Sequence, residues 1–213
     1  MSEEAHPIEG LTSVGAGSMP SLTQGSLTGR KRDIVNQAAV LFDDVGYSRA
    51  SMEDLAALVG VAKPTLYHYF SSKDEILYEI HREFITDLIT KQEARFGTTG
   101  TGADHLLAIM TDVLELMRSH RGHVRVFFEH HRELHEDKKS EVVAQRQRYQ
   151  RMVEEVIGRG VRDGSFSGAV DTRLATLAVF GMCNWAYQWY DPAGLNTPRE
   201  IAESFFEILS NGL

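Results

Sequence analysis

The chain has 213 residues and a formal net charge of −8, and 42% of its residues are hydrophobic, which is typical of a globular protein with a buried core. Its one cysteine, Cys183, excludes an intramolecular disulfide framework and suits a reducing cytoplasm. No apolar run approaches the length of a membrane-spanning helix, and the N-terminal stretch lacks the basic-then-apolar pattern of a secretory signal. We therefore expect a cytoplasmic protein with no membrane partner.

The N-terminal stretch, residues 1–29, is rich in Gly, Ser and Thr and shows no apolar periodicity. This composition predicts a disordered arm. The basic run Arg30-Lys31-Arg32 follows it. Such a run could reach a phosphate or the minor groove of DNA, and a solvated helix start explains it equally well.

Two helices are expected next. The first spans about Arg30 to Val45, with an apolar stripe along one side, and ends at Gly46. The second opens at Ser51, with Asp54 in capping-box position, and ends at Gly60, where a glycine relieves the cost of a left-handed backbone.

A third short helix opens with Pro64 in its first turn, where the missing N–H costs nothing. Two short helices joined by a tight glycine turn are typical of a helix-turn-helix, whose second helix lies in the major groove of DNA. Only the side chains of Leu66 and Phe70 need to face the core to anchor this helix. The side chains left outside can donate hydrogen bonds or carry charge, as contact with phosphates and base edges requires: Lys63, Thr65, Tyr67, His68 and Tyr69. Alternatively, one or both tyrosines pack against a neighbouring helix.

We therefore predict that this segment binds double-stranded operator DNA, with Ser51 and Lys73 holding phosphates on either side. The predicted DNA-binding residues are Ser51, Lys63, Pro64, Thr65, Tyr67, His68, Tyr69 and Lys73. Residues 30–78 carry six Lys/Arg against seven Asp/Glu, so the segment is not a simple basic clamp. Its specificity must come from a few hydrogen-bonding side chains.

The run G-Y-x-x-A-S-M-E-D-L-A-x-x-V-G-V-A-K-P-T-L-Y-H-Y-F-S-S-K-D-E-I-L closely resembles the N-terminal DNA-binding region of TetR-family transcriptional repressors. The resemblance covers about Arg30 to Leu77 and combines the turn, the T-L-Y-x-Y-F helix and S-K-[DE]-E at fixed spacing. It implies an all-α homodimer. Each subunit would have a three-helix DNA-binding head over residues 30–77 and a ligand-binding and dimerisation body over residues 78–213.

The body is expected to be helical throughout. Its first helix starts at the Ser72 cap, with Glu75 closing a capping box, and runs to about Phe96, so it could transmit a movement of the body to the DNA-reading helix. The last helix is capped by Thr197 and Glu200. The helices between them are predicted over residues 104–119, 121–131, 138–163 and 171–190.

The last two helices are the most apolar part of the chain. The first of them carries apolar or small residues along one face: Leu174, Leu177, Ala178, Gly181, Met182 and Trp185. The core of one subunit cannot easily enclose both this face and the apolar stripe along the final helix. We therefore predict a two-fold interface built from these two helices of each subunit, the alternative being that they fill the core of a monomer.

Catalytic, metal and cofactor motifs are weak or missing. His131 and His135 have the i, i+4 spacing of two metal ligands on a helix, but the surrounding Arg and Glu residues suit an exposed face. The chain has no G-x-S-x-G elbow, no P-loop and no G-x-G-x-x-G. We expect no enzyme activity, no catalytic residues, no metal and no cofactor.

A ligand cavity in the body is the better prediction, because polar side chains recur along its apolar helices. The predicted ligand-binding residues are Arg125, Phe128, His131, Arg146, Tyr149, Gln150, Asn184, Trp185 and Gln188.

The segment G-S-F…D…N-W-A-Y-Q-W-Y-D-P-A-G resembles a TetR subgroup that senses acyl-CoA thioesters and represses fatty-acid or steroid-ring catabolic genes. This resemblance implies an acyl-CoA effector, with arginines such as Arg125 or Arg146 at its phosphates. One alternative is a repressor that senses a drug-like or flavonoid compound and controls an efflux gene. An alternative of another class is a helical carrier or enzyme that does not act on DNA.

Overall fold

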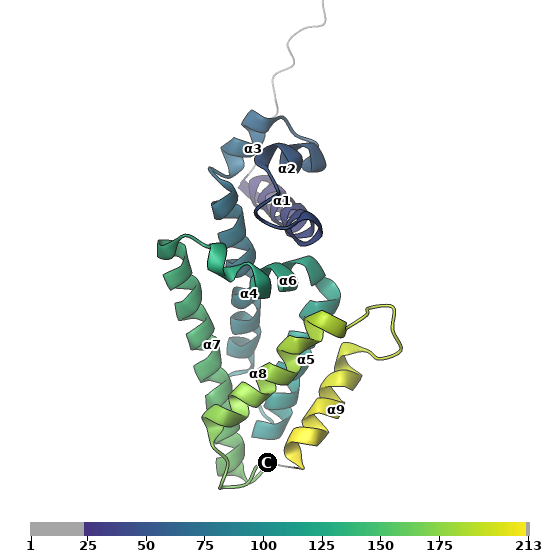
Figure 1. Cartoon of the computed structure of the whole chain (residues 1–213). Coiled ribbons are helices and arrows are strands. Elements are labelled where there is room, and N and C mark those ends of the chain that lie inside the picture. Colours follow the sequence, from purple (N-terminus) through teal and green to yellow (C-terminus); the bar gives the residue numbers. More distant parts are fainter. Residues whose placement is uncertain (1–23, 212–213) are drawn as a thin grey trace, which may run out of the picture.

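The computed structural model describes residues 24–211, and all regular structure in this part of the chain is helical, which confirms the predicted all-α fold. The helices are α1 Gln24–Val45, α2 Met52–Val59, α3 Lys63–Tyr69, α4 Lys73–Arg95, α5 Gly102–Ser119, α6 Arg121–Glu129, the 3-10 turn η1 His131–Glu133, α7 Glu136–Asp163, α8 Thr172–Trp189 and α9 Pro198–Ser210. A head of α1–α3 sits above a larger body, and α4 runs from one into the other (Figure 1). No helix in the described part combines the length and apolar composition that crossing a bilayer requires.

The turn between α2 and α3 forms as local sequence signals predict. Ser51 caps α2 in a reciprocal box with Asp54, and Gly60 ends the helix with a left-handed φ of 71°. Leu66 and Phe70 anchor α3 in the core of the head, where they are 0% and 1% exposed. The outward face of α3 is therefore held by two fully buried side chains a turn apart.

The start of α1 and the cap of α4 differ from the prediction. Helix α1 begins at Gln24 rather than Arg30, so residues 24–29 belong to a helix and not to the predicted arm; residues 1–23 lie outside the described residues. At the start of α4, Ser72 accepts a bond from the N–H of Glu75, as predicted. The Glu75 carboxylate, however, accepts from the N–H and hydroxyl of Ser71, at 2.7 and 2.8 Å. The predicted reciprocal box at Ser72 therefore does not form, because the preceding serine offers this carboxylate two donors.

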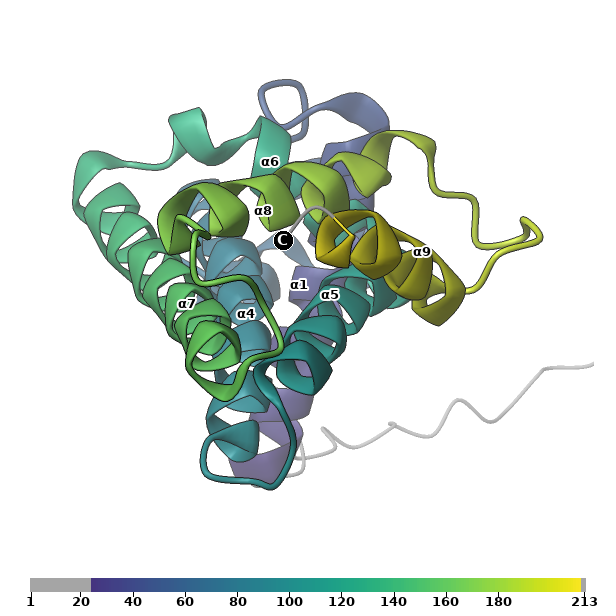
Figure 2. The same cartoon turned by 90° about the horizontal axis from the view of Figure 1, so that it is seen from below.

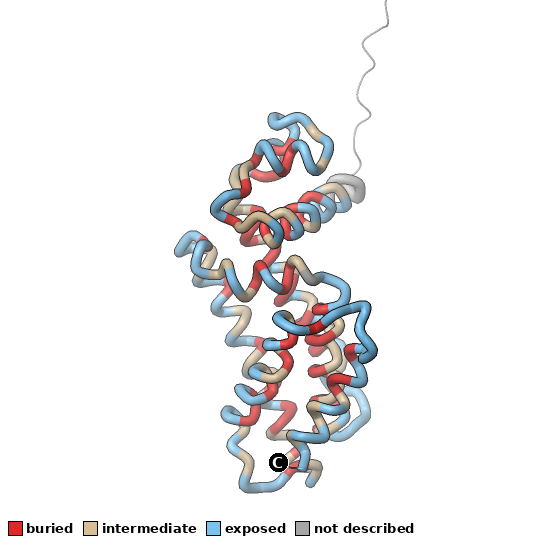
Figure 3. Tube along the Cα trace, turned by 45° about the vertical axis from the view of Figure 1, so that its right-hand side comes forward, coloured by how far each residue is buried: buried red, intermediate tan, exposed pale blue. Residues whose placement is uncertain are grey.

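The buried residues form two clusters, one in the head and one in the body, and Figure 3 shows them along the chain. Helix α4 contributes to both, with Ile76 and Leu77 in the head and Phe84 and Leu88 in the body. Helix α6 crosses beneath the head, where Val126 enters the head cluster. One continuous helix therefore links the two cores, so α4 can transmit a displacement in the body to the head.

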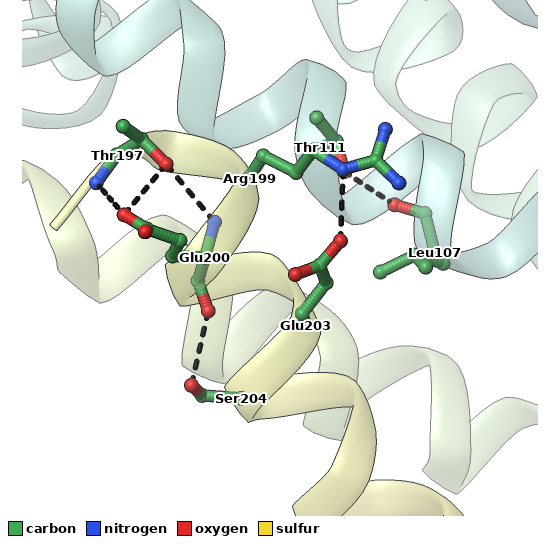
Figure 4. A network of polar contacts seen from close by, with 7 residues as sticks. All are labelled: Leu107, Thr111, Thr197, Arg199, Glu200, Glu203 and Ser204. Carbon is green, nitrogen blue, oxygen red and sulfur yellow. Dashed lines mark hydrogen bonds and ion pairs between the residues drawn. The ribbon is translucent and has the colours of Figure 1, made fainter.

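Helices α8 and α9 lie on the same side of the body, as seen from below in Figure 2. The predicted capping box of α9 is present: the Thr197 hydroxyl and the Glu200 carboxylate each bind the other residue's N–H, at 3.2 and 2.7 Å (Figure 4). An Arg199–Glu203 ion pair at 2.8 Å supports the exposed side of the same helix. Helix α9 packs against α5 through buried Ile201.

The start of α5 lies directly against α7. A Cβ added to Gly102 would collide with the backbone of Gly160, and the N–H of Gly102 donates to Asp163 at 2.7 Å. A Cβ on Gly160 would in turn collide with the ring of Phe166. The backbones of the two helices approach closely only because these positions carry no side chain.

Gly102→Ala is expected to lower the free energy of unfolding by about 1–3 kcal/mol, because backbone atoms cannot yield as a flexible side chain can. Urea denaturation followed by circular dichroism measures this loss. Gly168→Ala is the control, since nothing lies within 4 Å of a Cβ there. Equal losses in the two variants would contradict the argument from close packing.

Candidate DNA-reading helix and ligand cavity

Helix α3 presents a polar surface at the far end of the head from the body. The exposed residues on it are Lys63, Pro64, Thr65, Tyr67 and His68. The Tyr67 side chain is 44% exposed, and the Lys63 ammonium lies 5.9 Å from the centre of its ring and pairs with Glu53 of α2. This surface offers hydroxyl, imidazole and ammonium groups on one short helix, a set that can bond to both base edges and phosphates.

Tyr69 does not belong to this surface. It is 8% exposed and packs in the core of the head, so the prediction that it faces outward is wrong. The physical reason is helical spacing: Leu66, Tyr69 and Phe70 are at i, i+3 and i+4 and therefore share the inner face. The ring of His68 lies edge-on to Tyr69, with 5.9 Å between ring centroids.

The two residues predicted to hold flanking phosphates are engaged within the head. The Ser51 hydroxyl bonds to Asp54 at 2.6 Å as part of the α2 cap. The Lys73 ammonium donates to the carbonyls of Tyr47 and Ala50, at 2.6 and 2.8 Å, and lies 4.2 Å from the centre of the Tyr47 ring. A phosphate contact by Lys73 would have to add to these bonds or replace them.

The basic run before the head lies within α1 and packs on the helix-turn-helix. Arg30 donates to the carbonyl of Val59 at 3.2 Å, and the Lys31 ammonium lies 5.3 Å from the centre of the Phe70 ring. These contacts brace α1 against both helices of the motif.

A cavity of about 170 Å³ lies in the body between α4, α5, α6, α7 and α8. The residues lining it are Phe84, Ile85, Leu88, Val113, Phe127, Phe128, Arg146, Tyr149, Gln150, Phe180 and Asn184. The predicted ligand residues among them are Phe128, Arg146, Tyr149, Gln150 and Asn184. The others were not predicted, because an apolar side chain that lines a cavity looks the same in a sequence as one that fills a core. The mix of apolar wall and few polar groups is typical of a ligand site.

The remaining predicted ligand residues do not line this cavity. Arg125 is on the surface, where it pairs with Asp43 and Glu129 at 3.4 and 3.3 Å. The Nδ1 atom of His131 is 3.0 Å from the carbonyl of Phe128. Trp185 and Gln188 are exposed, because they occupy the face of α8 opposite its buried residues.

The polar wall of the cavity is formed by Arg146. Its Nη2 donates to the carbonyl of Phe127 at 2.8 Å, and its guanidinium carbon lies 3.9 Å from the centre of that ring. Burial lowers the pKa of Arg146 to about 10, so the group stays charged at neutral pH. His81, which is 0% exposed, lies against the same Phe127 ring, with 5.1 Å between the ring centroids. Burial, and after it the charge of Arg146, lowers the pKa of His81 to about 3, so its ring is neutral.

The histidines with metal-like spacing do not share a helix. Helix α6 ends at Glu129, so His131 falls in η1 and His135 precedes α7. His135 pairs with Asp137 at 2.8 Å instead. Within the described residues, no three His, Cys, Asp or Glu side chains are grouped closely enough to hold a metal ion.

The outer face of α8 and the end of α9 expose large apolar side chains. Leu174 is 63% exposed, Trp185 62% and Ile208 66%. Gly181 lies between the first two on α8, and nothing in the described chain lies within 4 Å of a Cβ placed there. An exposed apolar face of this kind is typical of a contact surface.

Two family models match the chain. One is described as "Bacterial regulatory proteins, tetR family" and matches residues 34–80; the other is described as "Tetracyclin repressor-like, C-terminal domain" and matches residues 99–213. A curated relative, the HTH-type transcriptional repressor KstR2 of Rhodococcus jostii, is 26% identical over 87% of this chain and 92% of its own. The solved structure of the TetR family regulator PfmR from Thermus thermophilus has a TM-score of 0.78 and 30% identity, covering 84% of this chain and 98% of that one. The solved structure of AibR in complex with isovaleryl coenzyme A and operator DNA has a TM-score of 0.73 and 26% identity, covering 84% of this chain and 97% of that one.

Proposed function

This chain belongs to the TetR family of bacterial regulatory proteins, and from that premise we propose that it is a homodimeric transcriptional repressor released from its operator by an acyl-CoA thioester. It would act in the cytoplasm by binding alone, with no catalytic step. The observation that carries the proposal is an apolar cavity with a charged wall in the body, joined by α4 to a polar helix in the head.

The DNA-binding part of the proposal rests on α3. Lys63, Thr65, Tyr67 and His68 would contact phosphates and base edges in the major groove, with Pro64 setting the first turn. Two such helices in a dimer would bind a palindrome with half-sites about 34 Å apart, one helical turn, or a multiple of it.

The effector part of the proposal rests on the cavity and on two relatives. AibR was solved with isovaleryl coenzyme A and operator DNA, and KstR2 of Rhodococcus jostii is an HTH-type transcriptional repressor. A cavity of about 170 Å³ is small for a ligand site, so it suits a short or compact acyl group with the coenzyme outside. An uncharged drug-like compound is the alternative effector; in the cavity it would leave the charge of Arg146 without a partner, as a plain acyl group would.

The coupling between cavity and DNA would run through α4. Phe84, Ile85 and Leu88 line the cavity, and Ile76 and Leu77 of the same helix are buried in the head. The proposed boundary between head (residues 30–77) and body (residues 78–213) thus falls inside one helix. An acyl group that displaces α4 would change the spacing of the two heads, with a coupling free energy of about 1–3 kcal/mol.

Adding short acyl-CoA thioesters is expected to release the operator, because the acyl group would favour a cavity shape that sets the heads at the wrong spacing. A mobility-shift assay on the protein's own promoter region, with thioesters from four to sixteen carbons, measures the release. Free coenzyme A is the control, since it carries no group to enter the cavity. An operator that stays bound at every chain length would exclude this effector class.

A further inference from the structure

No acidic side chain in the described part of the chain pairs with Arg146. No ion pair among the described residues includes Arg146, and its Nε is buried without a hydrogen-bond partner. Burial is the sole cause of its lowered pKa, so no carboxylate acts on it strongly enough to oppose that shift. Arg146 is half-buried, and a charge that is partly removed from water is normally paired, because an unpaired one is costly to desolvate.

The surroundings of Arg146 add no negative charge. Arg146, His131 and His130 each lie close enough to His81 to disfavour a proton on its ring. Among the described residues, the one hydrogen bond that Arg146 makes goes to a neutral carbonyl, that of Phe127. The site around Arg146 is therefore electropositive, and the guanidinium of Arg146 can still donate hydrogen bonds to an acceptor.

A second polar group on the cavity wall is also free. Asn184 of α8 lines the cavity, and its amide makes no hydrogen bond within the described part of the chain. Gln150, the third polar residue of the wall, donates to Glu154 at 2.8 Å. The remaining lining is almost entirely aromatic or aliphatic.

We propose that the part of the effector enclosed by the cavity carries a carboxylate, which pairs with Arg146 and bonds to Asn184. The natural effector would then be the monothioester of a short dicarboxylic acid with coenzyme A, which keeps one free carboxylate, and not a plain fatty acyl-CoA. This inference rests on the proposed function, because it assumes that the cavity holds the effector. A guanidinium pairs with a carboxylate through two parallel hydrogen bonds, and these are strongest where water is excluded.

The test compares two thioesters of equal length, hexanoyl-CoA and adipoyl-CoA, which differ by the terminal carboxylate. Operator release from the full-length dimer is titrated with each. We expect adipoyl-CoA to act at a concentration at least about tenfold lower, since a charge-assisted pair outweighs a methyl contact here. Arg146→Met should remove this preference by weakening adipoyl-CoA far more than hexanoyl-CoA. Glutaryl-CoA and pentanoyl-CoA repeat the comparison one carbon shorter.

Arg151→Met is the matched control, because Arg151 is an exposed arginine of α7 that does not line the cavity. It should keep the full preference for adipoyl-CoA. Arg146→Lys keeps the positive charge but loses the paired N–H donors of the guanidinium, so this variant should retain part of the preference for adipoyl-CoA. Arg146→Lys takes the place of Arg146→Met if the methionine variant does not fold.

The outcomes separate this inference from the proposed function. If both thioesters of each pair release the operator equally, or the plain one acts at lower concentration, the carboxylate inference is overturned and the thioester repressor stands. If no thioester releases the operator, the effector class fails, and the melting temperature with free hexanedioate or hexanoate decides the inference. Stabilisation by hexanedioate that is lost in Arg146→Met supports the carboxylate site; equal or absent stabilisation by the two acids overturns it.

Discussion

Replacing Gly181 with arginine is expected to yield a folded monomer whose operator affinity is at least about a hundredfold lower, because two linked heads bind far more tightly than one. Within one subunit an arginine fits there, since Gly181 is exposed and has no neighbour within 4 Å of its Cβ position. Between two subunits it would place a charge in the apolar face of Leu174, Leu177 and Trp185.

Light scattering coupled to size exclusion measures the mass of the variant, and fluorescence anisotropy with an operator duplex measures its affinity. Val143→Arg is the control, because Val143 is a 43% exposed apolar residue of α7. It should remain a dimer with unchanged affinity. A dimeric Gly181→Arg protein would rule out the α8 face as the interface.

Tyr67→Ala is expected to lower operator affinity by about a hundredfold or more, because each of two subunits would lose about 1–3 kcal/mol of contact with the DNA. The ring is 44% exposed and does not belong to the head cluster, so the fold should be unaffected. Fluorescence anisotropy with the operator duplex gives the affinity, and thermal denaturation gives the stability.

Tyr69→Ala provides the contrast on the same helix. Its ring is 8% exposed, so its removal should lower the free energy of unfolding by about 3–5 kcal/mol. A Tyr67→Ala protein that binds the operator normally would remove α3 from the DNA interface. A loss of stability equal to that of Tyr69→Ala would instead show that Tyr67 is structural.

The sequence by itself determined the local architecture of this protein. The cap at Ser51, the left-handed Gly60 and the capping box at Thr197 all formed as predicted. Each is a set of contacts among residues at most four positions apart, so the residues that form it are visible together in the sequence. The order of the helices and the helix-turn-helix follow from such signals, as does the apolar face of α8, which is a repeat along a single helix.

Only the tertiary structure decided which side chains meet. The sequence assigned Tyr69 to the outer face of α3, yet the head core encloses it. It treated Arg125 and Arg146 alike, although the first pairs with Asp43 on the surface and the second lines the cavity. These outcomes depend on helices far apart in the chain, whose packing angle and depth no local pattern encodes. The cavity and its uncompensated charge therefore became visible only once five separate helices were placed around them.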